Sequence, residues 1–556
     1  MLLVSRMSRN VENEQGTALL AALGLTAVAA VIAIVVTTTS LFSVGFTTAT
    51  QAAVQSQAAA EAGIDFAAAS VSSTTTACQA SYSNSSAPLF TVTVSYSTLS
   101  PVPSPLPDTG MTWVSGCPTL GATLVKFVST GTASSPGLVG NAGGNTRRVE
   151  AIFPFRPNAP GTGATLYSFS QTDSTGTNFT LTQGSTTATP SIQYLTAPGG
   201  LVCTSANNTI NGNLVVGSGS VTIGTQCQIN GDLSAGGVIT VKGTVTGNVT
   251  SASSSSPAIS VTGQVNGSIY AGGPVSIGGP IGGNVVAGPG GGTTTISATV
   301  GGSVVAAGAV SPPVTTLVTG TITQNKTGMV APTAPFVPGW VDYPWSTYSL
   351  TAFQNLGYTE NILPAASCTS AAAVNTELSR ELALPTPQIF NALACGAAGP
   401  NFGNLPSTVT LTNNLVIVAS SLAFPNSGNS FVSSVSTSSS PHRKLWLIIP
   451  DMNLTGVGTP PLPQPDCPGP QTISVGKLTV SASGNVDAMI YSPCYIANSP
   501  NSWQGQIYAS GLKMSNGFQI NYVPLGLPGY DLSNGGGNSG PAPGVLGTRT
   551  SIRNIS

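Results

Sequence analysis

Residues 210–214 read INGNL, the first of six copies of a five-residue pattern that decides the fold of this chain. Each copy has an apolar residue, any residue, a glycine, a small polar residue and a second apolar residue. The other five copies read INGDL from Ile229, VTGNV from Val245, VNGSI from Val265, IGGNV from Ile281 and VGGSV from Val300. Their glycines are separated by 19, 16, 20, 16 and 19 residues.

A nearly fixed period of this length is typical of a solenoid. Short alternating runs such as Ile239–Val241 and Val275–Ile277 lie between the copies, and their period of two, with the many glycines, excludes helical repeats. The pattern predicts a parallel β-helix over 205–310, with glycine at the corners. A β-sandwich with regularly spaced hairpins is the alternative. The coils resemble, in pattern only, the repeats of bactofilin-type polymer-forming proteins.

Apolar alternation returns between 405 and 533, for example at Leu415–Val418 and Lys444–Pro450. The run from Leu478 to Pro493 (LTVSASGNVDAMIYSP) is followed by Trp503–Ala509 (WQGQIYA). This segment is similar to the right-handed β-helical domain found at the C-terminus of large PilX-like proteins. The expected fold class is therefore mainly β, with right-handed parallel β-helix segments.

The N-terminus carries an apolar run, Ala18–Val36, of 19 residues, which is long enough to cross a bilayer of ~30 Å. No charged residue lies between 17 and 50. Arg6 and Arg9 precede the run and favour a cytoplasmic start. A cleaved secretory signal, a plain membrane anchor and a prepilin all remain open on these grounds.

Two segments resemble the PilX-type minor pilins of type IV pilus systems. They are EQGTALLAAL at Glu14–Leu23 and QAAAEAG at Gln57–Gly63. The resemblance implies that a prepilin peptidase cleaves between Gly16 and Thr17, and that other pilins are partners. The mature chain would carry Ala21 at its fifth position, where major pilins have Glu, which argues against a main fibre subunit.

The runs at Leu124–Gly131 and Asn145–Ala151 resemble two strands common in these proteins, which implies a small pilin-like β-domain. The expected organisation is a prepilin-like leader at 1–16, a transmembrane and extended N-terminal helix at 17–70, the pilin-like β-domain at 71–156, a linker with strands at 157–204, the β-helix at 205–310, a connector or cap with a short helix near 370–384 at 311–404, a C-terminal β-helical domain at 405–533 and a flexible tail at 534–556.

The chain has eight cysteines and no CxxC pair, so their spacing does not suggest a zinc site. An even number favours disulfides formed in an oxidising compartment. Buried reduced thiols are the alternative. Sequence order suggests the pairs Cys78–Cys117, Cys203–Cys227, Cys368–Cys395 and Cys467–Cys494.

Charged residues make up only 6% of the chain, and the formal net charge is −1. No basic stripe is present to neutralise phosphates, so nucleic-acid binding is not expected. Polysaccharide-cleaving β-helices need clustered acids and bases, whereas Asp232 and Lys242 are the only charged residues between 209 and 310. The single histidine, His442, is interpreted as a solvated loop residue. We expect no catalysis, no metal site and no cofactor.

Three functions are compatible with these patterns. The first is a non-enzymatic minor pilin or pilus-associated protein of a bacterial surface, with a single-pass membrane helix and its bulk outside the cytoplasm. The second is a membrane-tethered adhesin or envelope scaffold independent of pili, which could bind surface glycans. The third is a carbohydrate-active enzyme on a β-helix. Membrane lipid is a partner in the first two.

Overall fold

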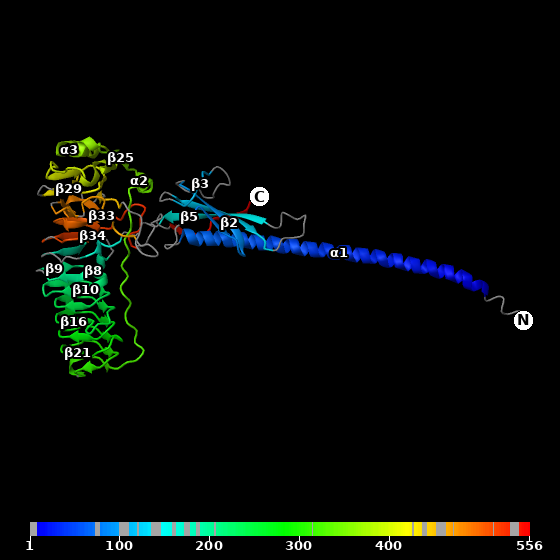
Figure 1. Ribbon diagram of the computed structural model, residues 1–556, viewed down its shortest axis with the longest axis horizontal. Helices are drawn as coiled ribbons and strands as arrows, with labels where there is room; N and C mark the ends of the chain where they lie inside the picture. The colour runs from blue at the N-terminus through cyan, green and yellow to red at the C-terminus, as the bar shows by residue number, and fades with distance from the viewer. Residues whose placement is uncertain are drawn as a thin grey trace. The chain divides into compact units, whose positions relative to one another are not determined.

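The computed structural model describes residues 8–72, 78–98, 111–118, 122–134, 146–157, 163–171, 178–184, 189–204, 207–313, 315–424, 428–435, 442–451, 463–470, 472–476, 478–514, 516–533 and 544–555. The chain is mainly β, with one long N-terminal helix (Figure 1). It divides into two compact units. The helix–sheet unit contains Met1–Pro157 and Pro543–Ser556, and the stacked unit contains Asn158–Ala542.

The helix–sheet unit combines helix α1 with an antiparallel sheet. The strand order is β1-β2-β4-β5, with β3 on β2 and the C-terminal strands β36 and β37 on the other edge of β5. The bounds are α1 Ser8–Val71, β1 Ser81–Asn84, β2 Leu89–Ser97, β3 Val114–Ser115, β4 Leu124–Thr132, β5 Thr146–Pro157, β36 Gly544–Leu546 and β37 Ser551–Asn554.

The first half of the stacked unit contains strands β6 to β24, and it includes the six motif copies. We call each repeat of these strands, which pairs with the repeat before it, a coil. Their bounds are β6 Leu166–Ser170, β7 Thr180–Gln183, β8 Ser191–Cys203, β9 Asn208–Ile210, β10 Asn213–Ile223, β11 Cys227–Ile229, β12 Leu233–Ala235, β13 Ile239–Val241, β14 Thr244–Val245, β15 Val249–Ser251, β16 Ile259–Val261, β17 Gln264–Val265, β18 Ile269–Ala271, β19 Val275–Ile277, β20 Val285–Ala287, β21 Thr294–Ile296, β22 Val304–Ala306, β23 Val310–Ser311, the 3-10 helix η2 Thr315–Leu317 and β24 Ile322–Thr323.

The strands of this region form three parallel ladders, in which each strand pairs with its counterpart one motif later. The first ladder runs β10-β12-β15-β18-β20-β22-β24, and the second runs β10-β13-β16-β19-β21-β23. The third runs β9-β11-β14-β17 and continues through bridges at Ile281, Val300 and Val318. Most three-residue strands bury their two outer residues and turn the middle one outward, so the apolar residues share one core.

The motif glycines stack on one another along the ladders. A Cβ placed on Gly231, Gly247, Gly267 or Gly283 would collide with backbone atoms of the motif glycine one coil earlier. The polar residue that follows each glycine caps the next coil, since Asn213 Oδ1 accepts the Asp232 amide at 2.9 Å. The same bond recurs down the stack at Asp232, Asn248, Ser268, Asn284 and Ser303. The five-residue pattern thus records a contact between coils.

The second half of the stacked unit adds two short helices and further parallel strands. Its bounds are α2 Thr347–Gln354, β25 Thr359–Ile362, η3 Ala365–Ser367, α3 Ala371–Leu382, β26 Gln388–Asn391, η4 Leu393–Ala398, β27 Thr408–Leu411, β28 Leu415–Val418, β29 Asn429–Ser433, β30 Arg443–Ile448, β31 Thr472–Ser474, β32 Leu478–Val480, η5 Ala482–Gly484, β33 Val486–Asn498, β34 Ser502–Leu512 and β35 Gln519–Tyr522.

The two halves join into one 30-stranded sheet. Strand β34 pairs with β6 and β35 pairs with β7, both in parallel. The last coil of the chain therefore lies on the first, at a junction we call the seam. The sequence left open whether the two segments stack, and the register Ile507↔Leu166 and Gln519↔Thr180 shows that they do.

A segment of irregular backbone at 325–346, which we call the strap, returns alongside the coils from β24 to α2 (Figure 1). Trp340 of the strap is fully buried. Its ring lies 4.8 Å from that of Tyr508, which stacks on Tyr167 at 4.2 Å across the seam and on Tyr491 at 5.5 Å. The strap thus fastens both halves through one aromatic cluster.

Tyrosine hydroxyls also hold the strap backbone. The Tyr167 hydroxyl donates to the carbonyl of Pro338 at 2.9 Å, and the Tyr508 hydroxyl accepts the Val341 amide at 2.9 Å. Because these groups are buried, each unmade bond would cost the desolvation of a polar atom. Backbone groups of the irregular strap are therefore hydrogen-bonded by tyrosine side chains that point from the strands toward the strap.

A buried carboxylate secures the same site. Asp451 is fully buried and accepts from Trp340 Nε1 at 2.8 Å. Burial, and secondly the nearby charge of Asp451, raise the pKa of Asp342 on the strap to about 7. The packed position of the strap is therefore more stable when Asp342 is protonated.

Three expected boundaries differ in the structure. The linker region 157–204 holds β6, β7 and β8, which belong to the stacked unit, and the connector region 311–404 holds β25 and β26 of the same sheet. The expected short helix is present as α3. The tail at 534–556 is not wholly flexible, since 544–555 contains two strands that pair with β5. Long-range pairing of this kind leaves no periodic signal in a short segment.

We predict that Gly267→Ala destabilises the stacked unit, because its Cβ has no room beside the backbone of Gly247 and Asn248. Overpacking of this kind costs about 1–3 kcal/mol. Thermal unfolding of the full chain in detergent measures the loss. Gly291→Ala is the matched control, since nothing lies within 4 Å of its Cβ position. Equal melting temperatures for the two variants would contradict the proposed glycine contact.

We predict that Asp342 makes the stacked unit less stable as the pH rises. The pKa of Asp342 is raised in the folded state. The contribution of Asp342 to the free energy of unfolding is therefore complete below the ordinary carboxyl pKa near 3.8, and it is lost as the pH rises to about 7. Between pH 4 and 8 the wild type should lose stability relative to Asp342→Asn in thermal melts. Asp65→Asn on α1 serves as the control. Parallel curves for the wild type and Asp342→Asn would show that Asp342 does not act in this way.

Candidate functional site

The first part of α1 presents an apolar surface with no protein cover. Every large apolar side chain from Leu19 to Phe46 is at least 53% exposed. In the described part of the chain, this is the one helix long and apolar enough to cross a membrane. Together with four disulfides, it is compatible with a membrane-anchored protein whose body lies outside the cytoplasm.

Threonine hydroxyls within this surface donate hydrogen bonds to backbone carbonyls one turn earlier in the same helix. Thr37 Oγ1 donates to the Ala33 carbonyl at 2.7 Å, and Thr47 Oγ1 donates to the Ser43 carbonyl at 2.8 Å. Thr26, Thr38, Thr39, Thr48 and Thr50 bond in the same way. Polar groups need such internal partners in lipid, because no water is there to replace them. The threonines are therefore no obstacle to burial in a bilayer.

The second part of α1 is a different surface, made of small residues that face the sheet. Ser56, Ala60, Ile64 and Ala67 are fully buried. Ala60, Ile64 and Ala67 pack with Phe90 and Val92 of β2, Phe127 of β4 and Val149 of β5. One continuous helix therefore has a bare half and a docked half.

Two glycines set the distance between the helix and the sheet. A Cβ on Gly131 of β4 would overlap the backbone of Ser56 and Ala60. A Cβ on Gly63 of α1 would overlap Ser129 Oγ of β4 and lie 2.9 Å from a methyl of Val92. The docked half can approach the sheet this closely only because both positions lack side chains.

The expected cleavage residues Gly16 and Thr17 fall in the helical backbone of α1. The surroundings of these two residues lie outside what the structure describes. Far along the same helix, in the docked half, Glu61 of the QAAAEAG segment is exposed, and its carboxylate accepts from Gln57 Nε2 at 2.8 Å, one helical turn earlier.

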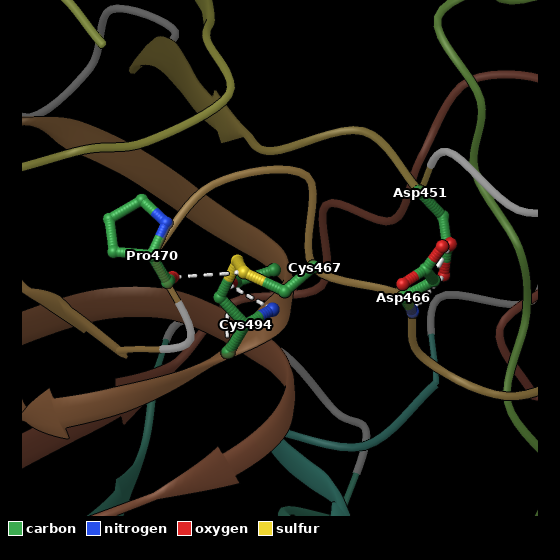
Figure 2. The surroundings of a disulfide bond; sticks show 6 residues. Asp451, Asp466, Cys467, Pro470 and Cys494 are labelled. Carbon is green, nitrogen blue, oxygen red and sulfur yellow. Dashed lines mark hydrogen bonds between the residues drawn. A yellow bond between two sulfur atoms is a disulfide. The ribbon is translucent and has the colours of Figure 1, made fainter. Parts of the chain in front are cut away.

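The eight cysteines form four disulfides, and the pairing is the one that sequence order suggested. They are Cys78–Cys117, Cys203–Cys227, Cys368–Cys395 and Cys467–Cys494. Figure 2 shows the last of them, with Asp451 and Asp466 on neighbouring segments. The first disulfide lies in the helix–sheet unit and the other three in the stacked unit, so both units carry a covalent brace.

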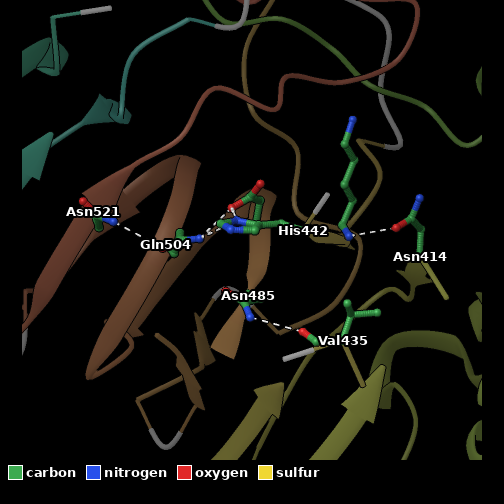
Figure 3. Close-up of polar contacts among 8 residues, drawn as sticks. Asn414, Val435, His442, Asn485, Gln504 and Asn521 are labelled. Carbon is green, nitrogen blue, oxygen red and sulfur yellow. Dashed lines mark hydrogen bonds and ion pairs between the residues drawn. The ribbon is translucent and has the colours of Figure 1, made fainter. Parts of the chain in front are cut away.

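The sequence suggested that His442 is a solvated loop residue; it does lie outside the strands, but its side chain is only 26% exposed and belongs to a polar cluster (Figure 3). Its Nδ1 lies 2.8 Å from Asp487 Oδ1, to which Gln504 Nε2 also donates at 2.7 Å. Asn521 Nδ2 donates in turn to Gln504 Oε1 at 3.2 Å. Sequence reasoning missed the cluster because its members come from β33, β34, β35 and the residue before β30, which meet only in the stack.

Within the described residues, no three His, Cys, Asp or Glu side chains gather to hold a metal ion. No family model matches the chain, and no curated protein or solved structure resembles it significantly. The arguments for function therefore rest on the geometry given above.

We predict that Gly131→Ala loosens the docked half of α1 by about 1–3 kcal/mol, because the added methyl meets helix backbone that cannot move aside. Hydrogen exchange of the amides at 52–71 should become faster. Gly24→Ala in the bare half is the control, since nothing lies within 4 Å of its Cβ position. Unchanged protection in Gly131→Ala would refute the close approach.

Proposed function

We propose that this chain is a non-enzymatic structural protein of a bacterial surface, a minor pilin or pilus-associated protein. The division of α1 into a bare apolar half and a half docked on an antiparallel sheet carries the proposal. The bare half suits a membrane before assembly and an apolar fibre core afterwards. The helix–sheet unit is, on this view, the small pilin-like domain.

The stacked unit is, on the same proposal, one continuous parallel β-helix. Three parallel ladders around a shared apolar core support this assignment. Its disulfides and its outward residues, which are mostly small and polar, suit a long-lived surface body. The function is mechanical: the helix holds the chain, and the β-helix is the bulk that it displays.

A specific observation favours a second candidate, a membrane-tethered adhesin or scaffold that binds surface glycans. Polar residues follow the strands across the seam: Lys444 pairs with Asp487, Gln504 with Asn521, and Asn521 with Thr182. All of them except Gln504, which is only 2% exposed, are at least partly exposed. Thr182 Oγ1 donates to Asn521 Oδ1 at 3.1 Å, so the row is continuous there. The partly exposed members offer an amide at Asn521, a hydroxyl at Thr182 and charged groups at Lys444 and Asp487, all of which can hydrogen-bond sugar hydroxyls.

The mature N-terminus separates the two candidates. We predict that mass spectrometry of the protein from membranes and from sheared surface material finds a start at Thr17. Gly16→Val should abolish this processing, whereas Gly24→Ala should not. An intact Met1 would favour the tethered scaffold, and a cut near 58–60 would indicate a secreted protein. Either of these results would rule out the pilin proposal.

A further inference from the structure

The sheet of the helix–sheet unit gathers basic residues that lie far apart in the sequence. Residues 124–157 and 544–555, which contain β4, β5, β36 and β37, hold six of the 15 lysines and arginines of the chain but only one acid, Glu150. The six are Lys126, Arg147, Arg148, Arg156, Arg549 and Arg553. In a chain with only 6% charged residues, this is a strong local excess of positive charge.

Glu150 compensates only part of this charge. It is 6% exposed, its Oε1 accepts from Arg553 Nη2 at 2.8 Å, and its Oε2 lies 3.8 Å from Lys126 Nζ. Arg147 and Arg148 are both exposed, and neither forms an ion pair with another side chain that the structure describes. Two arginines are therefore available to an anion from outside the chain.

The strand register places these two arginines next to the start of the docked half of α1. Arg147 pairs with Gly131 of β4, and Arg148 pairs with Thr130. A Cβ on Gly131 would overlap the backbone carbonyl of Ser56, near the point where α1 passes from its docked half to its bare half. Because successive residues of a strand point to opposite faces, the two arginines flank the sheet at this end.

The opposite end of the sheet lies farther from the bare half. Gly63, later in α1, lies against Ser129, so β4 runs toward the bare half as its residue numbers rise. The Thr550 amide donates to the Ile152 carbonyl at 2.9 Å, which places the exposed Arg549 beyond Ile152 on the far side from Arg148. Arg549 therefore has the same chemistry as Arg147 and Arg148 but lies at the other end of β5.

Helix geometry sets the distance from these arginines to a bilayer. At about 1.5 Å per residue, Leu19–Phe46 spans about 42 Å, which matches a bilayer of about 40–45 Å with its headgroups. From Phe46 to Ser56 is about a further 15 Å along the helix. A long arginine side chain, and the tilt of about 20° that is typical of membrane helices, both shorten this distance.

The two sides of the unit differ in charge at this level. The acids of the docked half, Glu61 and Asp65, are exposed on α1, whereas Arg147 and Arg148 lie on the sheet. Each lysine or arginine close to a membrane surface strengthens binding of anionic lipid about fivefold. The sheet side is therefore the one that an anionic bilayer attracts.

We infer that Arg147 and Arg148 bind the phosphates of anionic lipid headgroups in the membrane that holds α1. A guanidinium group suits this ligand, because it can donate two parallel hydrogen bonds to one phosphate. The inference rests on the membrane-held helix of the proposed function, which the pilin and the tethered scaffold share. Contact on the sheet side fixes which side of the helix–sheet unit faces the bilayer.

The test uses the full chain in lipid nanodiscs that contain equal amounts of phosphatidylglycerol and phosphatidylcholine. Native mass spectrometry counts the lipids that stay bound when the chain is released from the discs. We expect the wild type to retain phosphatidylglycerol preferentially, and Arg147→Gln and Arg148→Gln each to lower the ratio of the two lipids about fivefold. Arg549→Gln is the matched control and should leave the ratio unchanged. All three side chains are exposed, so the variants should melt with the wild type.

Equal ratios in the wild type and both arginine variants would overturn the inference. An equal fall in Arg549→Gln would do so too, since it would show a general effect of charge. Inorganic phosphate, added at constant ionic strength, separates the two sources of the ligand: loss of the lipid preference would identify free phosphate and overturn the assignment to lipid. A chain that does not enter the discs would refute membrane anchoring itself, whereas a chain that enters without preference refutes this inference alone.

Discussion

The stacked unit depends on the distance between neighbouring coils, which the hydrogen bonds of parallel strands hold near ~4.8 Å. At the corners this distance leaves no space for a Cβ, so the motif residues Gly231, Gly247 and Gly267 lie directly against the coil before them. The polar residue that follows each glycine then caps the backbone of the next coil. Apolar residues one place farther along the chain point inward, so one corner geometry serves both the turn and the core.

The same constraint operates where α1 meets its sheet. Gly131 and Gly63 allow the backbones to approach, and alanines fill the remaining interface. The docked half of α1 buries mostly alanines together with Ile64, whereas the bare half exposes large apolar side chains. By its length and composition, the bare half is able to cross a bilayer. This asymmetry is the physical basis of the function we propose.

The seam shows how a chain that reverses its course still forms a single core. The second half builds its coils from the far end and finishes on β6 and β7, where the first half began. The strap carries the chain between the two ends, and it is held by stacked tyrosines that belong to both halves. Loss of strap packing would therefore weaken the seam as well as the strap itself.

The sequence by itself determined the features that repeat or lie close together in the chain. The motif period fixed the stacked coils, an uncharged run fixed the apolar helix, and sequence order matched all four disulfides. Only the tertiary structure decided the seam, the strap contacts of Trp340, the cluster around His442 and the strands at 544–555. Each of these joins residues far apart in the chain through single contacts. A repeated contact between neighbouring segments produces a periodic sequence pattern. A contact that is made only once, between residues far apart in the chain, produces no such pattern.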